Sequence, residues 1–377
     1  MAIDFSKITS SAYVVEEALL RKNLELIQAV QERAGVKVIL ALKGFAMWRL
    51  FPMVGQYLAG ATASSLHEAR LIAEEMGKKA HTYAVAYRPH EFQEILQYSS
   101  HITFNSLSQF ECYKGQARAA GASIGLRVNP GYSEVEVALY NPAADGSRLG
   151  EAPANLAGGL PLEVEGLHLH TLCESSAEAF EHLVAAFEAK FGQFIPQLQW
   201  VNFGGGHLMT RKGYDIDRLV AALVRFREKY QVEVYLEPGS AIAWETGVLV
   251  ATVLDIVDNH NIKTAILDVS FTAHMPDTLE MPYRPRITGA VPPNEHIHNY
   301  RMGGTSCLAG DFMEVYGFEQ PLQIGQQLIF EDMIHYTTVK TTMFNGVHHP
   351  DLCLWTEDQQ LQVLRRFDYQ DYKNRMN

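Results

Sequence analysis

Short apolar runs alternate with amphipathic stretches between residues 36 and 240. The eight runs are VKVILALK (36–43), AGATASS (59–65), HTYAVA (81–86), HITFN (101–105), SIGLRVN (123–129), VEGLHLHT (164–171), QWVNFGG (199–205) and VEVYLEPG (232–239). Most are apolar at successive positions, which is typical of strands covered on both faces of a parallel sheet. They therefore predict eight buried parallel strands.

Between several of these runs, apolar positions recur at helical spacing. The stretch 215–230 repeats an apolar residue every three or four positions, and so does 175–192, which begins with serines that are favourable helix caps. Eight strand–helix alternations over about 200 residues predict an α/β fold, namely a (β/α)8 TIM barrel. A doubly wound open sheet is the competing topology.

The pattern changes after about residue 246, where β-rich runs follow one another without helical stretches between them. GVLVATVLDIVD and KTAILDVS are such runs, and turn signals follow in PYRPR, VPPNE and RMGGTS. We therefore expect a barrel over residues 15–246 and a mainly antiparallel β domain over residues 247–377. The first strand, within residues 1–14, is expected to join the β domain, and the helix ALLRKNLELIQAVQERAG leads into the barrel.

Composition and charge restrict the class of protein. The 377 residues are 47% hydrophobic and carry a net charge of −12, so a basic surface for nucleic acid is not expected. The start of the chain lacks a signal-peptide pattern, and no window approaches 18 uninterrupted apolar residues, so no membrane association is expected. The four cysteines form no C-x-x-C pair, and a reducing cytoplasm fits them best.

Reactive side chains stand at the C-terminal ends of four predicted strands, where barrel enzymes gather their active sites. Lys43 ends the first run, His168 and His170 the sixth, Gly204–Gly206 the seventh and Glu237 the eighth. A lysine is costly to bury unless it is used, and a lowered pKa would free its amine for a Schiff base. Read alone, Lys43 is a strand-end lysine that reaches solvent; the other three strand ends favour the functional interpretation.

The other strand-end groups each have a chemical and a structural interpretation. Consecutive glycines let backbone N–H groups approach a phosphate, or simply form a tight turn. Glu237 can keep a pyridine nitrogen protonated, or be a solvated loop acid. His168 and His170 point to one strand face like a pair of metal ligands, but no third ligand follows at a recognisable spacing, so no metal is expected.

Two more candidates lie in the predicted β domain, in the segment GGTSCLAGDF. The flanking glycines place Cys307 on a loop, where its thiol could deliver a proton near a catalytic centre; a buried structural cysteine is the alternative. Asp311 could pair with a substrate ammonium group or act as a turn residue.

These motifs, in this order, resemble the fold-type III pyridoxal-phosphate decarboxylases, a family with an alanine-racemase-like barrel that includes ornithine and diaminopimelate decarboxylases. The resemblance covers nearly the whole chain. The segments ALKGFA (41–46), FTAHMPDTLEMPYRP (271–285) and GGTSCLAGD (303–311) are most similar to the carboxynorspermidine branch. The resemblance implies pyridoxal 5′-phosphate as cofactor, an obligate homodimer with a shared active site, and a small cationic carboxylated polyamine as substrate.

The resemblance also implies roles for residues at matching motifs. Lys43 would carry the cofactor, His170 would stack on its ring, and Glu237 would bind the ring nitrogen. Cys307, from the partner subunit, would donate the proton that replaces CO2. The residues implied to lie near the cofactor or its phosphate are Glu68, Arg127, Gly204, Gly205, Gly206 and Tyr336. The acids expected to bind the substrate amines are Asp311, Asp277 and Glu280.

The chain departs from the family pattern at three places. Ser240 stands where the phosphate-binding arginine of E-P-G-R is common, Leu172 and Cys173 replace Gly-Ser of H-x-G-S, and Leu308 replaces an acid. These changes disfavour ornithine and diaminopimelate as substrates, although diaminopimelate or another basic amino acid stays the alternative.

Two rivals belong to other functional classes. A racemase of the same architecture would place an arginine at the ring nitrogen and a tyrosine opposite the lysine, which Glu237 and Cys307 oppose. A non-catalytic protein that binds or senses the cofactor should have lost Lys43 or Cys307, and both are present.

Overall fold

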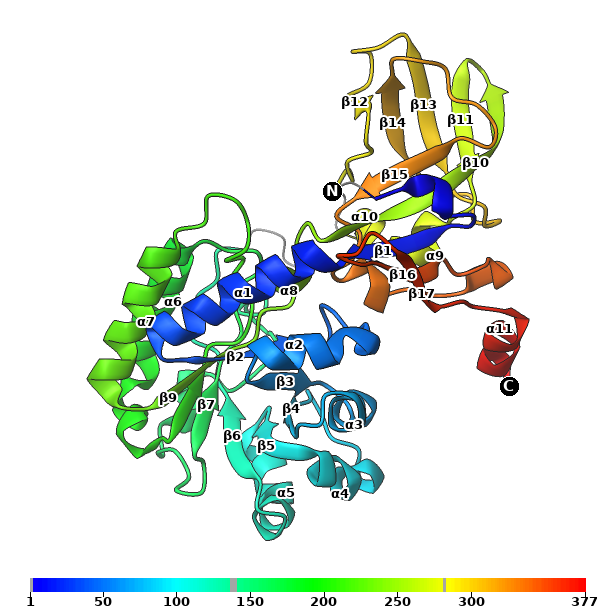
Figure 1. Ribbon diagram of the computed structural model, residues 1–377. Coiled ribbons are helices and arrows are strands. Elements are labelled where there is room, and N and C mark those ends of the chain that lie inside the picture. The colour runs from blue at the N-terminus through cyan, green and yellow to red at the C-terminus, as the bar shows by residue number, and fades with distance from the viewer. Residues whose placement is uncertain (1–2, 136–140, 281–282) are drawn as a thin grey trace. The chain divides into compact units, whose positions relative to one another are not determined.

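The computed structural model divides the chain into two compact units (Figure 1). One unit, the barrel unit, comprises Asn23–Ile242; the other, the sheet unit, comprises Met1–Lys22 and Ala243–Asn377. The structure describes residues 3–135, 141–280 and 283–377. None of the helices in these ranges combines the length and apolar character that a membrane crossing requires.

The barrel unit contains the eight predicted strands. They are β2 (Lys37–Ala41), β3 (Gly60–Ala63), β4 (Ala80–Tyr83), β5 (Ser99–Phe104), β6 (Ser123–Arg127), β7 (Gly166–His168), β8 (Trp200–Asn202) and β9 (Glu233–Leu236). Each pairs in parallel with the next, and β9 returns to β2 through the pair Lys37↔Tyr235. The (β/α)8 barrel is therefore confirmed, and the open sheet is wrong because these strands leave no free edge.

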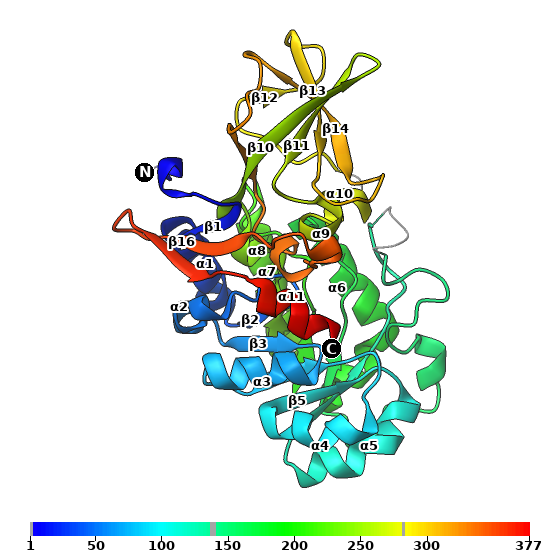
Figure 2. The ribbon, with the colours of Figure 1, turned by 90° about the vertical axis from the view of Figure 1, so that its right-hand side faces the viewer.

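Helices follow the strands around the barrel. They are α2 (Phe51–Tyr57), α3 (Leu66–Glu75), α4 (Pro89–Tyr98), α5 (Leu107–Ala119), α6 (Ala177–Phe191), α7 (Ile216–Tyr230) and α8 (Ser240–Ala243), and α1 (Glu17–Ala34) precedes β2. Figure 2 shows α3, α4 and α5 side by side on the outside of the barrel strands. The helices predicted over 175–192 and 215–230 are α6 and α7, whose caps Ser176 and Asp215 accept backbone N–H groups.

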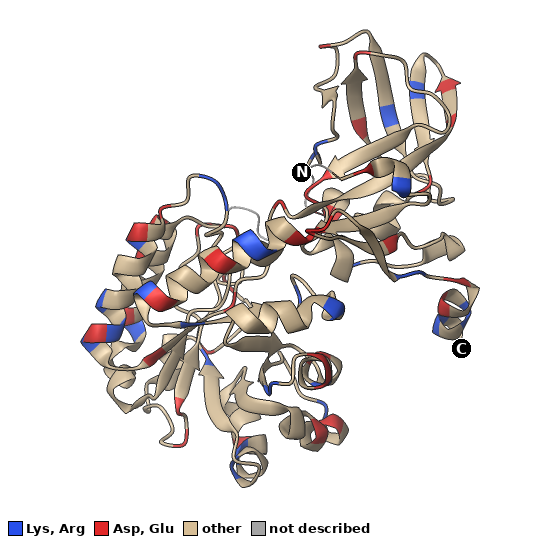
Figure 3. Cartoon of the chain, in the orientation of Figure 1, with Lys and Arg blue, Asp and Glu red and all other residues tan. Residues whose placement is uncertain are grey.

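The outer helices mix charges of both signs. Figure 3 shows acidic and basic residues alternating along α1 and α7. Inside the barrel the polar groups are arranged differently. The rings of His81 and His101 stack 3.7 Å apart, and Tyr235 lies against both rings. The barrel core is thus partly polar, and its imidazoles are packed against each other.

The sheet unit is built around nine strands. They are β1 (Ala12–Glu16), β10 (Gly247–Asn259), β11 (Ile262–Leu267), β12 (Ala290–Val291), β13 (His298–Gly303), β14 (Phe312–Phe318), β15 (Gln327–Glu331), β16 (Asp351–Trp355) and β17 (Leu361–Arg365). The order is β12-β14-β13-β11-β10-β1-β16-β17, and β15 pairs with β10. Most pairs are antiparallel, and β1 joins this sheet between β10 and β16.

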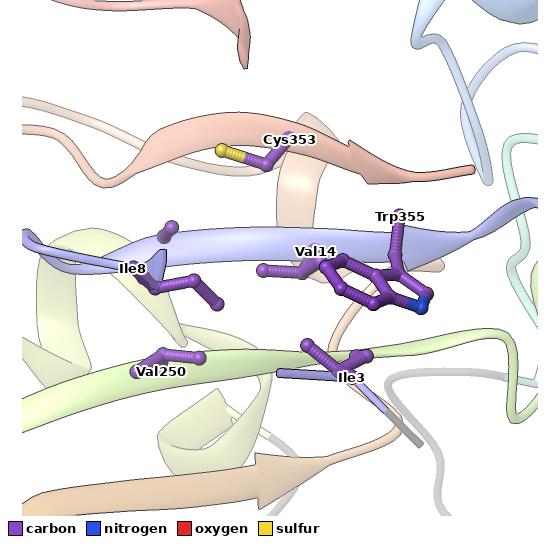
Figure 4. Packing of buried hydrophobic residues seen from close by; sticks show 7 residues of the cluster. Ile3, Ile8, Val14, Val250, Cys353 and Trp355 are labelled. Atoms are coloured by element: carbon purple, nitrogen blue, oxygen red, sulfur yellow. The ribbon is translucent and has the colours of Figure 1, made fainter. Parts of the chain in front are cut away.

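One core cluster of the sheet unit explains why the first strand belongs there. Val14 of β1, Val250 of β10 and Trp355 of β16 pack with Ile3 and Ile8 (Figure 4). Burying this apolar side of β1 requires strands from the far end of the chain.

Short helices interrupt the β pattern of the sheet unit and were not predicted. The α-helices are α9 (Phe271–His274), α10 (Asp277–Glu280) and α11 (Tyr369–Met376). The first two are single turns, and the last has no buried residue.

Candidate active site

Lys43, just after β2, lies beside His170, just after β7. The Nζ atom of Lys43 is 3.2 Å from Nε2 of His170, so two strand ends that are distant in sequence meet as predicted. The lysine side chain stays accessible to solvent although protein surrounds it. Removal of water by the surrounding protein lowers the pKa of Lys43. The negative charge of Glu237 opposes this shift, and the positive charge of Arg127 adds to it.

The proton on His170 can be assigned from its contacts. The N–H of Gly205 donates to Nδ1 of His170 at 2.8 Å, so Nδ1 carries no proton. Burial holds the pKa of His170 well below its usual value, and the charge of Arg127 adds to the shift. The neutral ring then carries its proton on Nε2 and donates it to Lys43, which accepts only as a neutral amine. The contact therefore favours a nucleophilic lysine.

The Glu237 carboxylate, just after β9, is buried and faces two groups. Nδ2 of Asn202 donates to Oε1 at 2.7 Å, and Nε2 of His168 lies 3.4 Å from Oε2. Burial alone would raise the pKa of this carboxyl, but His168, Asn202 and His81 outweigh burial and lower the pKa to about 2. Glu237 is therefore ionised at neutral pH, as the partner of a protonated pyridine nitrogen must be.

The glycine loop, Gly204–Gly206, follows β8 and packs tightly against neighbouring strand ends. A Cβ on Gly205 would lie 2.3 Å from the carbonyl oxygen of Glu237. A Cβ on Gly204 would lie 2.5 Å from the carbonyl oxygen of Leu169, and the φ of Gly204 is +67°. No larger residue fits these positions without moving backbone.

The same loop offers fewer free N–H groups than its sequence suggests. The N–H of Gly204 donates to Oδ1 of Asn202 at 2.8 Å, and that of Gly205 is bonded to His170. Two of the three predicted phosphate donors are thus engaged with protein acceptors. Of the three glycines, Gly206 remains as the predicted phosphate donor, and its φ is +90°.

Arg127 and Glu68 lie near the same end of the barrel but contact protein groups. The guanidinium of Arg127 lies 4.6 Å from the centre of the Tyr83 ring and donates to the carbonyl oxygen of His170 at 3.1 Å. Oε2 of Glu68 accepts the N–H of Ser64 at 2.6 Å before α3, and burial raises the pKa of Glu68. Arg127 thus supports the backbone of His170, Glu68 stabilises a helix start, and their places beside the cofactor stay predictions.

Cys307 lies on an exposed loop between β13 and β14 of the sheet unit. Its N–H donates to Oδ1 of Asn345 at 2.9 Å, which joins the loop to the Phe344-Asn345-Gly346 segment. The apolar neighbours Leu308 and Phe344 are 48% and 46% exposed. An accessible thiol flanked by apolar side chains is suited to a site on another molecule.

Asp311 has a different environment from the one predicted. Its Oδ1 accepts the N–H groups of Phe271 and Thr272 at 2.7 and 3.1 Å. Its Oδ2 accepts the N–H and the hydroxyl of Ser306 at 3.1 and 2.6 Å. Both oxygens accept hydrogen bonds from protein groups and the residue is only 4% exposed; the pairing of Asp311 with a substrate ammonium stays a prediction. Asp311 ties the Cys307 loop to the start of α9.

Asp277 and Glu280, the other two predicted amine-binding acids, come together at α10. Both contact the Nζ atom of Lys340. Burial opposes ionisation of this lysine, but the two acids outweigh it and raise the pKa of Lys340. The acids therefore form one anionic pair that already holds a cation.

Tyr336 has an unusual backbone conformation, with φ 50° and ψ −47°. The N–H of Thr337 donates to the carbonyl oxygen of His335 at 2.5 Å, which makes Tyr336 the centre of a strained γ-turn. Such strain persists only where the surrounding structure enforces it, and it concentrates at functional sites. The predicted phosphate contact of Tyr336 stays a prediction with this independent support.

The family model described as pyridoxal-dependent decarboxylase, C-terminal sheet domain, matches residues 12–334. This chain belongs to the pyridoxal-dependent decarboxylases. A carboxyaminopropylagmatine decarboxylase from Synechocystis sp. is 50% identical over 98% of this decarboxylase and 96% of that protein. A carboxynorspermidine/carboxyspermidine decarboxylase from Campylobacter jejuni is 46% identical over 98% and 99% of the two chains.

A solved structure supports the same assignment. The crystal structure of carboxynorspermidine decarboxylase complexed with norspermidine, from Campylobacter jejuni, has a TM-score of 0.91 and 45% identity. The match covers 98% of this decarboxylase and all of that chain. The two therefore have the same fold.

The barrel residues of this decarboxylase fit pyridoxal phosphate, the cofactor of the family. Lys43 presents a neutral amine for the aldehyde, and Glu237 presents an ionised carboxylate for the ring nitrogen. His170 lies between the lysine and the glycine loop, where a flat imidazole can face an aromatic ring.

Three residues of the site were missed in the sequence. Asn202 connects Glu237 to the glycine loop, Tyr83 supports Arg127, and Asn345 holds the Cys307 loop. The signal for Asn202 was available, because a buried strand that ends in V-N-F-G-G has an unexplained polar residue in its apolar run.

Proposed function

We propose that this decarboxylase converts carboxynorspermidine and carboxyspermidine to norspermidine and spermidine, with release of CO2. The observation that carries the proposal is the meeting of Lys43, His170 and Glu237 at one end of the barrel. Relatives of this activity that match nearly the whole chain support the choice of substrate. The net charge of −12 also favours a cationic substrate.

The barrel residues divide the work between them. Lys43 would hold the cofactor through an amine kept neutral by donation from His170, and Glu237 would keep the ring nitrogen protonated. Gly206 and Tyr336 would contact the phosphate. When bound, pyridoxal phosphate accepts the electron pair that departing CO2 leaves behind.

The proton that replaces CO2 would come from Cys307 of a second copy of the chain. The exposed position of this thiol, with Leu308 and Phe344 exposed beside it, supports a homodimer in which each subunit completes the other's site. Asp311 and Asn345 would hold the loop in place.

The distal amines of the substrate would bind the acidic pair of Asp277 and Glu280. Because Lys340 already contacts both acids, a substrate ammonium would share or replace that contact. Carboxyaminopropylagmatine is a second candidate substrate, favoured by the 50% identical relative. Its guanidinium presents a planar fork to carboxylates, whereas an ammonium is a compact charge.

The test is CO2 release from carboxynorspermidine, carboxyspermidine, carboxyaminopropylagmatine, diaminopimelate, ornithine and arginine, with the Lys43→Ala variant as the blank. We expect kcat/KM for the preferred carboxylated polyamine to exceed that for diaminopimelate by about 100-fold, because the distal end of diaminopimelate carries a carboxylate, which the acidic pair would repel. A clear preference for diaminopimelate or ornithine would reject the proposal. A preference for carboxyaminopropylagmatine would select the second candidate.

The shared site predicts complementation between two inactive variants. Lys43→Ala and Cys307→Ala each damage one half of a site, so a mixed dimer keeps one intact site. Random subunit exchange should therefore restore about a quarter of wild-type CO2 release. If mixing restores nothing beyond the sum of the two variants, although exchange is demonstrated with labelled subunits, Cys307 does not act across subunits.

We also propose a cytoplasmic location. Cys112, Cys307 and Cys353 are free thiols. Free thiols, one of them assigned a catalytic role, suit a reducing compartment.

A further inference from the structure

His168 is the last residue of β7 and is buried inside the barrel, with 3% exposure. Neither of its ring nitrogens makes a hydrogen bond with any residue that the structure describes. Its ring packs edge-on against Tyr83, with ring centres 5.3 Å apart. Burying an imidazole without hydrogen bonds is costly, so its position calls for a functional explanation.

The one acidic group that lies at ion-pair distance from His168 in the described chain is Glu237. Nε2 of His168 is 3.4 Å from Oε2 of that carboxylate. The other carboxylate oxygen, Oε1, is held by Asn202, whose amide orientation is fixed because its own Oδ1 accepts the N–H of Gly204. One side of the carboxylate is thus anchored, and His168 faces the other.

We propose that His168 is a positioning residue that holds Glu237 in the orientation and the ionised state required by the ring nitrogen of pyridoxal phosphate. A small closure of the 3.4 Å gap would convert the contact to a hydrogen bond on Oε2. Without it, Glu237 would be held by Asn202 alone, and burial would favour its protonated form. The inference rests on the proposed cofactor-binding role of Glu237 and adds the residue that enforces it.

The charge state of His168 restricts how it can act. Burial lowers the pKa of this imidazole most; Glu237 opposes the shift, while Arg127 and Lys43 add to it. A neutral ring has one N–H, which must stand on Nε2 to serve the carboxylate. The inference therefore requires the Nε2–H tautomer.

Two polar substitutions separate this role from simple packing. In His168→Gln the amide nitrogen takes a place close to Nε2, whereas in His168→Asn it takes a place close to Nδ1, away from Glu237. The control is His101→Gln, a histidine of the barrel core that stacks on His81. Pyridoxal phosphate is titrated into each apo-protein at several pH values, and binding is followed by its visible absorbance.

We expect His168→Asn to weaken cofactor binding by about tenfold, as the loss of one hydrogen bond to a charged group should. In this variant the bound absorbance should also be lost at a higher pH on acidification, because the Glu237 carboxyl becomes easier to protonate. His168→Gln should stay within about twofold of wild type in both measurements, as should His101→Gln.

Equal losses in the Gln and Asn variants, or wild-type binding in both, would overturn the inference. If His168→Asn does not fold, as judged by circular dichroism of the apo-protein, the nitrogen-15 spectrum of wild-type His168 decides, and a proton on Nδ1 refutes the role. Failure of the proposed function gives a different result: wild-type protein would then gain no visible absorbance that depends on Lys43.

Discussion

Among single residues, Asp311 differs most between its expected and observed roles. Its position four residues after Cys307 suggested a ligand for a substrate amine, but its oxygens accept bonds from Phe271, Thr272 and Ser306. Two of these partners lie about 40 residues away in the chain, a pairing that local sequence cannot reveal. These contacts change what a substitution at this position should do.

We expect Asp311→Asn to lower kcat while leaving KM nearly unchanged. The amide has one acceptor oxygen in place of two, so either the Ser306 side or the α9 side of the loop loses its bonds, at about 1–3 kcal/mol. Cofactor binding by the barrel unit should persist. The measurement is kcat and KM for substrates with one and two distal amines. An increase in KM confined to the longer amine would restore the role as a substrate ligand.

At the scale of structural elements, the strand-to-helix loops of the barrel place the site. Lys43, His170, the glycine loop and Glu237 come from four different strand ends, and the apolar runs alone predicted that these ends share one edge. What the runs could not predict is which backbone groups the loops use for their own packing. The N–H groups of Gly204 and Gly205 are examples, since both bind neighbouring side chains.

Gly205→Ala should disrupt the glycine loop by contact alone. Its Cβ would meet the carbonyl oxygen of Glu237 at 2.3 Å, a backbone atom that cannot turn away. We expect a loss of about 1–3 kcal/mol in stability and a marked fall in affinity for pyridoxal phosphate. Gly115→Ala in α5 is the matched control, because nothing lies within 4 Å of the added methyl. Denaturant unfolding and cofactor titration measure both effects; equal behaviour of the two variants would contradict the packing argument.

The single-turn helices of the sheet unit show the limit of sequence patterns. The cap of α9, Ser270, directly precedes the helix in the chain. The first two N–H groups of the helix, however, donate to the carboxylate of Asp311, about 40 residues further along the chain. A four-residue helix carries too few positions for an apolar stripe to be recognised. The β-rich texture of this region was therefore correct, whereas its short helical turns depended on tertiary contacts.

For the whole molecule, histidines with lowered pKa values contribute to the response to acid. Burial, together with neighbouring charges, lowers the pKa of His81 to about 3, of His101 to about 4 and of His274 to about 3. In the unfolded chain these rings titrate near pH 6.5. Between the folded and the unfolded pKa of these rings, the unfolded chain binds more protons than the folded one. The contribution of the rings to the free energy of unfolding is therefore fully present above about pH 6.5 and is lost as the pH drops toward 3–4.

We therefore expect the thermal midpoint of the apo-protein to fall by on the order of 5–10 °C between pH 7 and pH 4. The double variant His81→Gln/His101→Gln removes two of the titrating rings and should show a shallower dependence. Differential scanning calorimetry of both proteins across this range is the measurement. Parallel curves would mean that the stacked pair in the barrel does not control acid stability.

The two-unit organisation of the molecule was largely visible in the sequence. The expected bounds of 15–246 and 247–377 lie close to the units Asn23–Ile242 and Met1–Lys22 with Ala243–Asn377. Apolar strands and amphipathic helices have local signatures, so the elements could be assigned. Connections such as that of Asn202 with Glu237 depend on side chains meeting in space, and patterns along the chain do not encode them directly.

The place of β1 in the sheet has a consequence during synthesis on the ribosome. This strand is synthesised well before its partners, which are β10, beginning at Gly247, and β16, beginning at Asp351. At a translation rate of about 5–20 residues per second, β1 stays unpaired for about ten seconds or longer before either partner strand has been synthesised. The barrel residues can fold during that interval, so nascent chains should need chaperone protection of this strand until both of its partners have been synthesised.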